Sequence, residues 1–220
     1  MNRYAIGDIH GGCKTFRALL DRLTLRPGDQ LYLLGDYIDR GPDSRGVLDT
    51  ILQLMDEVYD PRPVRGNHED MLLNSLAGND GYWMEGWGRE TLGSFGIASA
   101  KQIPARYLTL LDQMPYLRYD ENFVFVHAGV DLSVNDPLTK STPLAMVWGG
   151  NASFGRDRLQ GRTLVTGHKI LSLHLIKLSL LTNHFQLDNG AFTNMKPEMG
   201  NLVALNLDSM ELVVQPWCDG

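Results

Sequence analysis

The sequence has few cysteines and no dense run of basic residues. Its two cysteines, Cys13 and Cys218, lie far apart and form no CxxC pair, so they cannot build a disulfide framework. We expect Cys13 to be a small packing residue at the start of a helix rather than a reactive thiol. With 26 acidic residues against 20 basic ones, the net charge of −6 argues against a nucleic-acid partner.

Long apolar runs are also absent. The most apolar stretch, 170–181, is interrupted by His174 and Lys177 and is too short to span a bilayer. Residues 1–6 lead directly into the first polar motif and do not resemble a signal peptide. We therefore expect a cytoplasmic protein without a membrane partner. The 220 residues, 43% hydrophobic and 21% charged, suit a single globular domain over 1–220.

Apolar patterning in the first 80 residues repeats the order strand, loop, helix three times. The predicted strands are 3–6 and 30–34, with 61–64 leading into the third loop, and the predicted helices are 15–23, 47–58 and 69–76. This order favours an α/β fold in which helices cover a sheet. Later in the chain the pattern predicts one helix, a long loop over 135–161 and six strands: helix 105–114, and strands 116–119, 123–127, 163–166, 185–187, 202–207 and 212–215.

Five short polar motifs follow strand-like runs. They read GDIHG (7–11), GDYIDRG (35–41), GNHE (66–69), VHAG (126–129) and TGH (166–168). Asp8 and His10 are two residues apart, so both side chains can point the same way at the end of a strand. Carboxylates and imidazoles suit divalent first-row metals, and the carboxylate of Asp36 can bridge two of them. The motifs therefore predict a two-metal centre.

The other motifs complete this centre. Asn67 can add a neutral carbonyl ligand, and His127 and His168 follow two later strands. His68, beside Asn67, could point away from the metals and protonate a leaving alkoxide if a carboxylate such as Asp39 holds it.

Two arginines lie in or directly beside the motifs, and two histidines lie outside them. Arg40 and Arg65 are candidates for gripping a phosphate through paired hydrogen bonds, although Arg40 could equally form a surface salt bridge. Four of the six histidines lie in the motifs. We expect the other two, His174 and His184, to be structural.

The motif series resembles the PPP-type metallophosphoesterases, and in particular the short bacterial and phage serine/threonine protein phosphatases. The resemblance extends from residue 7 to about residue 190, and GDxxDRG together with GNHE is highly specific. It implies a sandwich of two mixed β-sheets flanked by helices, with the metal site at the strand ends. The segment 83–92 and the turn 188–191 (Asp-Asn-Gly-Ala) are also similar to segments of that family.

The resemblance further implies a role for each motif residue. One metal would take Asp8, His10 and Asp36, and the other would take Asp36, Asn67, His127 and His168. His68 would be the general acid, oriented by Asp39, with Arg40 and Arg65 on the phosphate. Manganese is the first choice of metal, and iron, zinc and cobalt suit the same ligands.

The chain departs from the family pattern at two positions. Lys169 follows His168 where the family commonly has threonine, and Gly150 stands where many relatives carry a third phosphate-binding arginine. Arg156, Arg158 or Lys169 could replace that arginine.

These residues predict a metal-dependent phosphatase acting on phosphoserine or phosphothreonine in proteins or peptides, with phosphotyrosine as a further substrate. A hydroxide bridging the two metals would attack phosphorus directly. One alternative is a dinucleoside polyphosphate hydrolase. Those relatives typically lack the second aspartate of GDxxDRG and carry GNHD, so Asp39 and Glu69 argue against it. Weaker alternatives are a nucleotide phosphodiesterase and a catalytically idle relative that binds phosphorylated partners or metals. No pattern indicates an oligomeric state.

Overall fold

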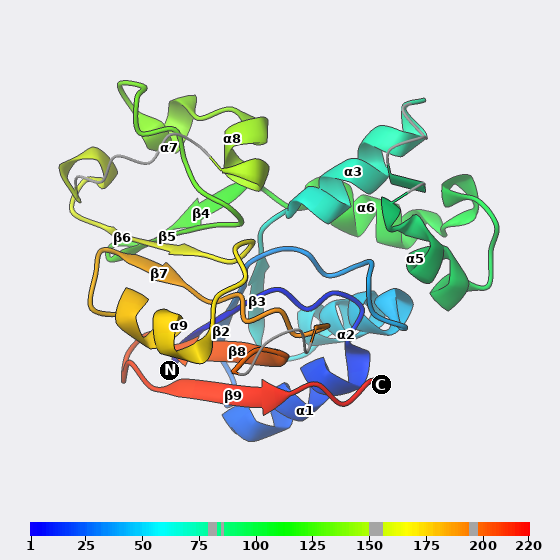
Figure 1. Ribbon diagram of the computed structural model, residues 1–220, viewed down its shortest axis with the longest axis horizontal. Helices are drawn as coiled ribbons and strands as arrows, with labels where there is room; N and C mark the ends of the chain where they lie inside the picture. Colours follow the sequence, from blue (N-terminus) through cyan, green and yellow to red (C-terminus); the bar gives the residue numbers. More distant parts are fainter. Residues whose placement is uncertain (79–82, 85, 150–155, 194–197) are drawn as a thin grey trace.

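The structure, a computed structural model, describes residues 1–78, 83–84, 86–149, 156–193 and 198–220. Its strands form two mixed β-sheets that share one core, and helices cover their outer faces (Figure 1). This is the α/β sandwich that the motif resemblance implied. Among the described residues, none of the helices has the length and apolar character needed to cross a membrane.

The larger sheet has five strands, with β1 at its centre. β1 pairs in parallel with β2, which pairs in parallel with β3, while β8 joins the other side of β1 in the antiparallel sense and β9 follows it. In spatial order the strands are β3 (Asp60–Pro63), β2 (Gln30–Leu33), β1 (Arg3–Ile6), β8 (Asn201–Asn206) and β9 (Leu212–Pro216).

The smaller sheet has four strands. β5 pairs in parallel with β6, and β6 with β7, while β4 adds an antiparallel edge. The order is β4 (Leu117–Tyr119), β5 (Phe123–Val126), β6 (Thr163–Thr166) and β7 (His184–Gln186).

Alternation along the strands explains how the layers pack. Successive side chains of a strand point to opposite faces of its sheet. In β2, Tyr32 joins the core between the two sheets, whereas Leu31 and Leu33 join the core under the helices. In β5, Phe125 faces the other sheet and Val124 faces outward. Both faces of both sheets are therefore buried around the central strands.

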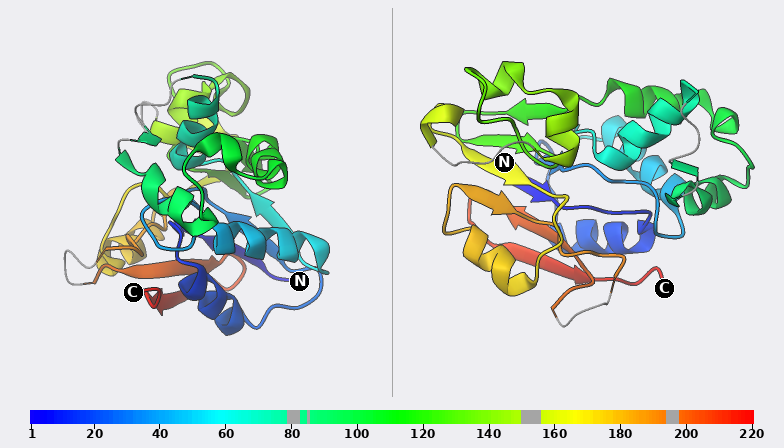
Figure 2. Two further views of the ribbon diagram at one scale, coloured as in Figure 1. Left: turned by 90° about the vertical axis from the view of Figure 1, so that its right-hand side faces the viewer. Right: turned by 45° about the horizontal axis from the view of Figure 1, so that its top comes forward.

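The helices form two groups on these outer faces, which Figure 2 shows from two further sides. In the first group α1 and α2 pack on the five-stranded sheet, while α5 packs on α2 and α3 packs on α6 beside them; the second group packs on the four-stranded sheet. The first comprises α1 (Cys13–Leu23), α2 (Ser44–Asp56), α3 (Asn67–Leu76), α5 (Gly88–Phe95) and α6 (Ala105–Gln113); the second comprises α7 (Pro137–Lys140) and α8 (Pro143–Trp148).

Short helices account for most differences from the sequence prediction. The predicted loop 135–161 contains α7, α8 and the 3₁₀ turn Arg156–Leu159, and α9 (Leu173–Ser179) was not predicted. The 3₁₀ turn Ala100–Gln102 also lies outside the predicted elements. These elements are too short to show an apolar period, but side chains cap three of them. The Ser99 hydroxyl accepts a hydrogen bond from the Lys101 N–H at the start of the 3₁₀ turn Ala100–Gln102. Thr142 accepts a hydrogen bond from the Ala145 N–H, and Ser172 accepts one from the Leu175 N–H.

Candidate metal centre

The loops after four strands bring the predicted ligands to one place. β1 leads into the first motif, β2 into the second, and β5 and β6 into the fourth and fifth, while the third motif begins α3 shortly after β3. Because these strand ends lie at one edge of the sandwich, residues far apart in sequence meet there. Five of the predicted ligands are buried and one, His168, is half-buried; the buried ones are Asp8, His10, Asp36, Asn67 and His127.

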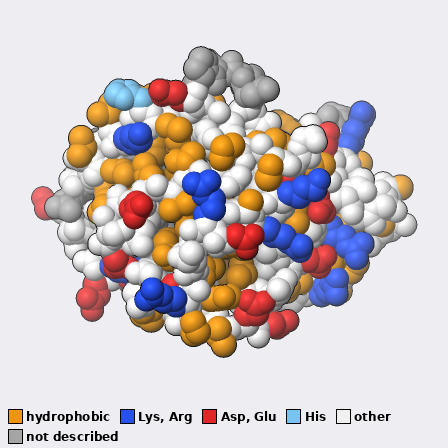
Figure 3. Space-filling model, turned by 90° about the horizontal axis from the view of Figure 1, so that it is seen from below, with side chains coloured by type: hydrophobic (Ala, Val, Ile, Leu, Met, Phe, Trp, Pro, Cys, Tyr) orange, Lys and Arg blue, Asp and Glu red, His pale blue; other side chains and the backbone are white. Residues whose placement is uncertain are grey.

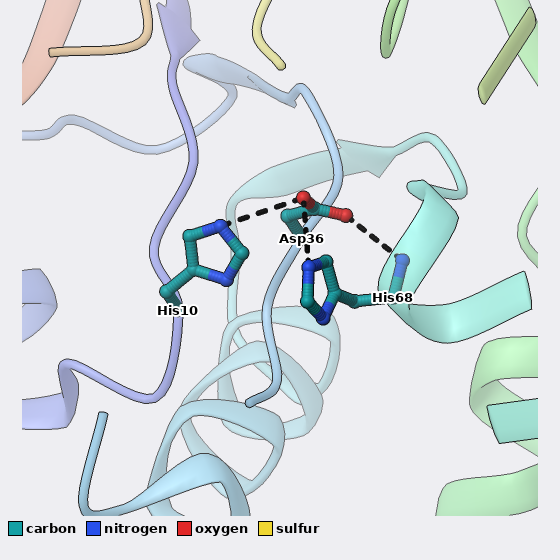
Figure 4. Close-up of side chains that lie close together, drawn as sticks. All are labelled: His10, Asp36 and His68. Atoms are coloured by element: carbon teal, nitrogen blue, oxygen red, sulfur yellow. Dashed lines mark hydrogen bonds and ion pairs between the residues drawn. The ribbon is translucent and has the colours of Figure 1, made fainter. Parts of the chain in front are cut away.

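One carboxylate oxygen lies at the centre of the site. Asp36 Oδ2 is 3.4 Å from His10 Nε2 and 3.4 Å from His127 Nε2. It therefore belongs to two groups of potential ligands, one with His10 and His68 and the other with His127 and His168. Figure 4 shows that the rings of His10 and His68 lie beside the Asp36 carboxylate. The backbone N–H of His68 donates to the other oxygen of Asp36, Oδ1, at 3.1 Å. Asp36 thus has the position expected of a bridging ligand.

Backbone carbonyls fix which nitrogen of two imidazoles faces the site. The Nδ1–H of His127 donates to the Leu34 carbonyl at 2.8 Å, and that of His10 donates to the Ile38 carbonyl at 3.1 Å. Since a carbonyl only accepts, Nδ1 carries the proton and Nε2 keeps its lone pair. Burial is the main cause that lowers the pKa of both rings, so both remain neutral. Each imidazole therefore presents a lone pair to the centre.

Beside the second group of ligands, two acceptor atoms face each other, one from His127 and one from Asn67. His127 Nε2 lies 2.8 Å from the Asn67 side-chain oxygen and 3.1 Å from His168 Nδ1. His168 Nδ1 is in turn 3.1 Å from the same Asn67 oxygen. The lone pair of His127 and that oxygen would repel each other without a positive charge between them. The donor set therefore fits a divalent cation.

Asp8 contributes negative charge from a different position. It belongs to neither group of ligand atoms among the described residues, and its carboxylate accepts the backbone N–H of His168 at 3.1 Å. Burial is the main cause that raises the pKa of Asp8. The nearby carboxylates of Asp188, which is also buried, and of Asp36 raise this pKa further. Burial likewise raises the pKa of Asp188 to about 7. A cation would relieve this repulsion between buried carboxylates.

His68 is held by Asp39, away from the second ligand group. His68 Nδ1 lies 2.7 Å from Asp39 Oδ2, and neither side chain reaches solvent. Trp83 Nε1–H donates to the same oxygen at 2.8 Å, and the Thr91 hydroxyl donates to Oδ1 at 2.5 Å. Burial lowers the pKa of His68, but the carboxylates of Asp36 and Asp39 outweigh it and leave the pKa raised. His68 can therefore carry a proton into the site at Nε2.

Arg40 lies over the site with an unused donor. Its guanidinium is 4.4 Å from the centre of the Phe192 ring and 5.9 Å from that of Trp87. Its Nη2 is 3.3 Å from His68 Nε2, and its Nε is buried with no hydrogen-bond partner among the described residues. An unpaired buried N–H is costly, so an incoming phosphate oxygen would satisfy it.

Arg65 points elsewhere, contrary to the prediction that both arginines face the phosphate. It donates to the Asp112 carbonyl at 2.5 Å and to the Tyr116 hydroxyl at 3.0 Å, and it pairs with Asp70 at 3.7 Å. Its buried Nε lacks a partner among the described residues. The neighbouring α3 and α6 anchor this side chain, so contact with a bound phosphate would require it to leave them.

Two of the candidates for the missing arginine, Arg158 and Lys169, have exposed side chains. Gly150 lies outside the described residues, and Arg156 is the first residue of the 3₁₀ turn Arg156–Leu159. Arg158 is exposed and donates to the Val134 carbonyl. Lys169 is exposed and lines a surface groove of about 700 Å³ beside α9.

Figure 3, seen from below, shows apolar side chains exposed among charged ones on one face of the molecule.

Several site residues have backbone conformations that L-residues seldom adopt. Their φ angles are positive: 46° at His10, 53° at Asp36, 69° at Asp39, 68° at Arg40 and 64° at His168. Each costs on the order of 1 kcal/mol or more and persists only where the surroundings enforce it. Strain of this kind concentrates at functional sites.

Glu69 enforces part of this geometry, a role that the sequence prediction missed. Its carboxylate accepts the backbone N–H groups of Asp36 at 2.9 Å, Tyr37 at 2.8 Å and Gly66 at 2.9 Å. Glutamate at the third position of a helix can accept the backbone N–H of the residue before the helix, as the glutamate of a capping box does, so the signal was present in the motif. Glu69 thereby ties the second motif to the third.

Trp83, Thr91, Phe192 and Asp188 were also not predicted as site residues. Trp83 is 1% exposed, and its indole N–H donates to Asp39. Cys13 behaves as expected, because it is buried and burial raises the pKa of its thiol.

The comparisons with known proteins agree with this geometry. The calcineurin-like phosphoesterase profile matches residues 1–172. This chain therefore belongs to the calcineurin-like phosphoesterase family, whose members are metal-dependent hydrolases of phosphate esters. The family confirms the predicted fold and the phosphoesterase class.

The relatives carry names that differ from our first expectation. A symmetrical bis(5′-nucleosyl)-tetraphosphatase of Nitrosomonas europaea is 35% identical over 131 residues, which are 59% of this chain and 45% of that protein. One of Nitrosospira multiformis is 35% identical over 130 residues, 58% and 43% of the two chains. The alignments thus span less than half of these curated relatives. A cold-active protein-tyrosine phosphatase of a Shewanella species shares the fold, with a TM-score of 0.67 and 17% identity over 97% of this chain and 80% of that one.

Proposed function

We propose that this chain hydrolyses the phosphoanhydride bonds of dinucleoside polyphosphates by direct attack of water at a site that holds two divalent cations. The observation that carries the two-cation site is the single Asp36 oxygen shared by two groups of ligands. The names of the curated relatives support the choice of substrate. We therefore favour the dinucleoside polyphosphate hydrolase, which was the alternative in the sequence analysis, over the phosphoprotein phosphatase.

Six residues of this chain would form the cation site. His10, Asp36, Asn67, His127 and His168 would hold the cations, with Asp8 adding charge beside them. When bound, two such cations lower the pKa of water and neutralise charge on the phosphate. Manganese is the metal that we would test first.

Arg40 and His68 act on the substrate itself. Arg40 would donate from Nε and from its terminal nitrogens to phosphate oxygens, and the Phe192 ring keeps its guanidinium in place. As the P–O bond to the leaving group breaks, His68 Nε2–H would give its proton to the departing oxygen. Asp39 keeps the opposite nitrogen of the ring protonated and oriented throughout.

A second candidate function is a phosphomonoesterase acting on phosphoserine or phosphothreonine in a protein or peptide, with phosphotyrosine as a further substrate. The pairing of His68 with Asp39 favours it, because an alkoxide is a poor leaving group that needs an acid, whereas a nucleotide phosphate is a good one. The presence of Asp39 and Glu69 also departs from the pattern expected for dinucleoside polyphosphate hydrolases.

One titration separates these functions. Metal-stripped protein would be titrated with Mn²⁺ while its turnover of diadenosine tetraphosphate, a phosphothreonine peptide and p-nitrophenyl phosphate is measured. We expect metal-dependent turnover with the highest kcat/KM on the dinucleotide. A preference for the peptide would replace the first candidate with the second. Cation binding without turnover of any of the three would point to a catalytically idle relative and remove both.

A further inference from the structure

The segment Trp217–Asp219 reaches back to the loops of the first two motifs. It follows β9, and the chain end lies beside α1 (Figures 1 and 2). It is outside residues 1–172, the part matched by the family profile, and outside the five motifs. Its contacts are nonetheless with Gly12, Gly41 and the first turn of α1. No role described so far accounts for them.

Trp217 packs against a glycine from each loop. A Cβ added at Gly12 would overlap the indole ring, and one added at Gly41 would lie 2.8 Å from its Cη2 atom. Gly12 comes two residues after His10, and Gly41 directly follows Arg40. The backbone N–H of Trp217 donates to the Gly200 carbonyl at 3.0 Å, which fixes the ring relative to β8. One side chain therefore touches both loops at once.

Asp219 fixes the other end of the first loop. Its carboxylate accepts the backbone N–H groups of Lys14 and Thr15, each at 2.8 Å, and the Thr15 hydroxyl at 2.6 Å. The residue just before α1, Gly12, is the N-cap and has no side chain to cap the helix. Asp219 supplies the missing acceptor from more than 200 residues away, and it is itself only 8% exposed.

The two loops need such support because their backbones are strained. His10 and Arg40 both have positive φ angles, of 46° and 68°. The loops are also bonded to each other, since the N–H of His10 donates to the Asp36 carbonyl at 2.8 Å and that of Asp43 donates to the Gly11 carbonyl at 2.9 Å. A displacement of one loop is thus passed to the other.

We propose that Trp217 and Asp219 are positioning residues that hold the first two motif loops, and with them His10, Asp36 and Arg40, in the geometry that binds the cations. They touch neither cation nor substrate. The inference rests on the two-cation site proposed above but not on which substrate that site cleaves.

The test compares Trp217→Ala, Trp217→Phe and Asp219→Ala in the full chain. Mn²⁺ binding would be measured by calorimetry, and backbone amide exchange would be measured without metal over residues 7–16 and 35–43. Leu212→Ala is the matched control, because Leu212 lies on the same strand, β9, but packs into the core between the sheets. All measurements would be made at the same interval below each variant's melting temperature.

We expect Trp217→Ala and Asp219→Ala to weaken Mn²⁺ binding by about 10-fold and to speed exchange in both loops. Trp217→Phe should restore binding to within about twofold, since a phenyl ring still fills part of the space. Equal Mn²⁺ affinity and unchanged exchange in Trp217→Ala would overturn the proposal. So would an equal loss in Leu212→Ala, which would mean that general loosening is sufficient. Absence of Mn²⁺ binding in the wild type would overturn the proposed function, and the exchange data would then decide the positioning role alone.

Discussion

His68 Nδ1 and Asp39 Oδ2 are 2.7 Å apart inside the protein, and neither side chain is exposed to solvent. This pair leaves Nε2 as the only ring nitrogen of His68 that can exchange a proton with a substrate. The identity of the leaving group should therefore decide how much the pair contributes to the rate.

Replacing His68 by glutamine should lower kcat according to the leaving group. We expect a loss of about 100-fold or more on phosphothreonine peptide and a much smaller loss on p-nitrophenyl phosphate, whose leaving group departs without a proton. Diadenosine tetraphosphate should resemble the aryl ester. The measurement is kcat on all three substrates at saturating Mn²⁺. An equal loss on all three would show that His68 acts on the cations rather than as an acid.

Thr91 should support catalysis through Asp39. Thr91→Val keeps the shape but removes a hydrogen bond to a buried carboxylate, worth about 1.5–3 kcal/mol. We expect kcat on the peptide to fall at least about 10-fold, in line with that energy. Thr91→Ser, which keeps the hydroxyl, is the control and should stay within about twofold. If the two variants lose activity equally, the hydroxyl is not the group that matters.

Gly167 should tolerate no side chain. A Cβ there would overlap Asp8 Oδ1, so Gly167→Ala must displace the carboxylate or the loop that carries His168. We expect Mn²⁺ affinity to fall at least about 10-fold. Gly93→Ala, in α5 with open space around the position, is the control and should raise the free energy of unfolding by about 0.5–1 kcal/mol. Unaltered Mn²⁺ binding by Gly167→Ala would contradict the placement of Asp8.

Cations should stabilise the folded protein through Asp36. At a Mn²⁺ concentration 100 times the dissociation constant, one site adds about 2.7 kcal/mol to the free energy of unfolding. For a chain of this size we expect a rise in melting temperature of roughly 5–10 °C. Asp36→Asn should abolish both the rise and nearly all activity. A melting temperature of Asp36→Asn that still rises with Mn²⁺ would show that the cations bind elsewhere.

His184 should make the protein less stable in mild acid. Burial lowers the pKa of its imidazole to about 4, from an ordinary 6.5 in the unfolded chain. Between these values the unfolded chain binds the proton and the folded protein does not, so stability falls as the pH drops below 6.5. The full penalty, reached below pH 4, is about 3 kcal/mol.

Chemical denaturation of wild type and His184→Gln at pH 7.5 and 4.5 measures this penalty. The stability lost by the wild type between the two pH values should exceed that lost by the variant. A loss of the same size in both proteins would mean that other groups cause the acid sensitivity.

The motifs could be predicted from the sequence because four of them directly follow buried strands, whose ends bring Asp36, His127 and His168 together. The sandwich itself came from the family resemblance, since the apolar pattern indicates layers but does not pair β1 with β8. Trp83 and Thr91, which bond to Asp39, lie 44 and 52 residues further along the chain, so these bonds depend on how that part of the chain packs against the second motif. Nothing in the sequence around Asp39 indicates that these two residues are its partners.

The direction of the Arg65 side chain could not be predicted from the motif beside it either. An arginine beside GNHE has the right chemistry to grip a phosphate, but Tyr116 and the Asp112 carbonyl bind it first. Which partner an arginine selects depends on the elements that surround it, and α6 is one that the motif does not include. Asp219 is a similar case, because its partners are backbone amides at the opposite end of the sequence.

The ligand group of Asp36, His127 and His168 draws on both sheets, since Asp36 follows β2 and the two histidines follow β5 and β6. A slight separation of the sheets would pull this group apart while every strand still kept its hydrogen bonds. Loss of activity on heating should therefore precede loss of circular dichroism. Enzyme activity would then be a more sensitive measure of partly damaged molecules than secondary-structure content.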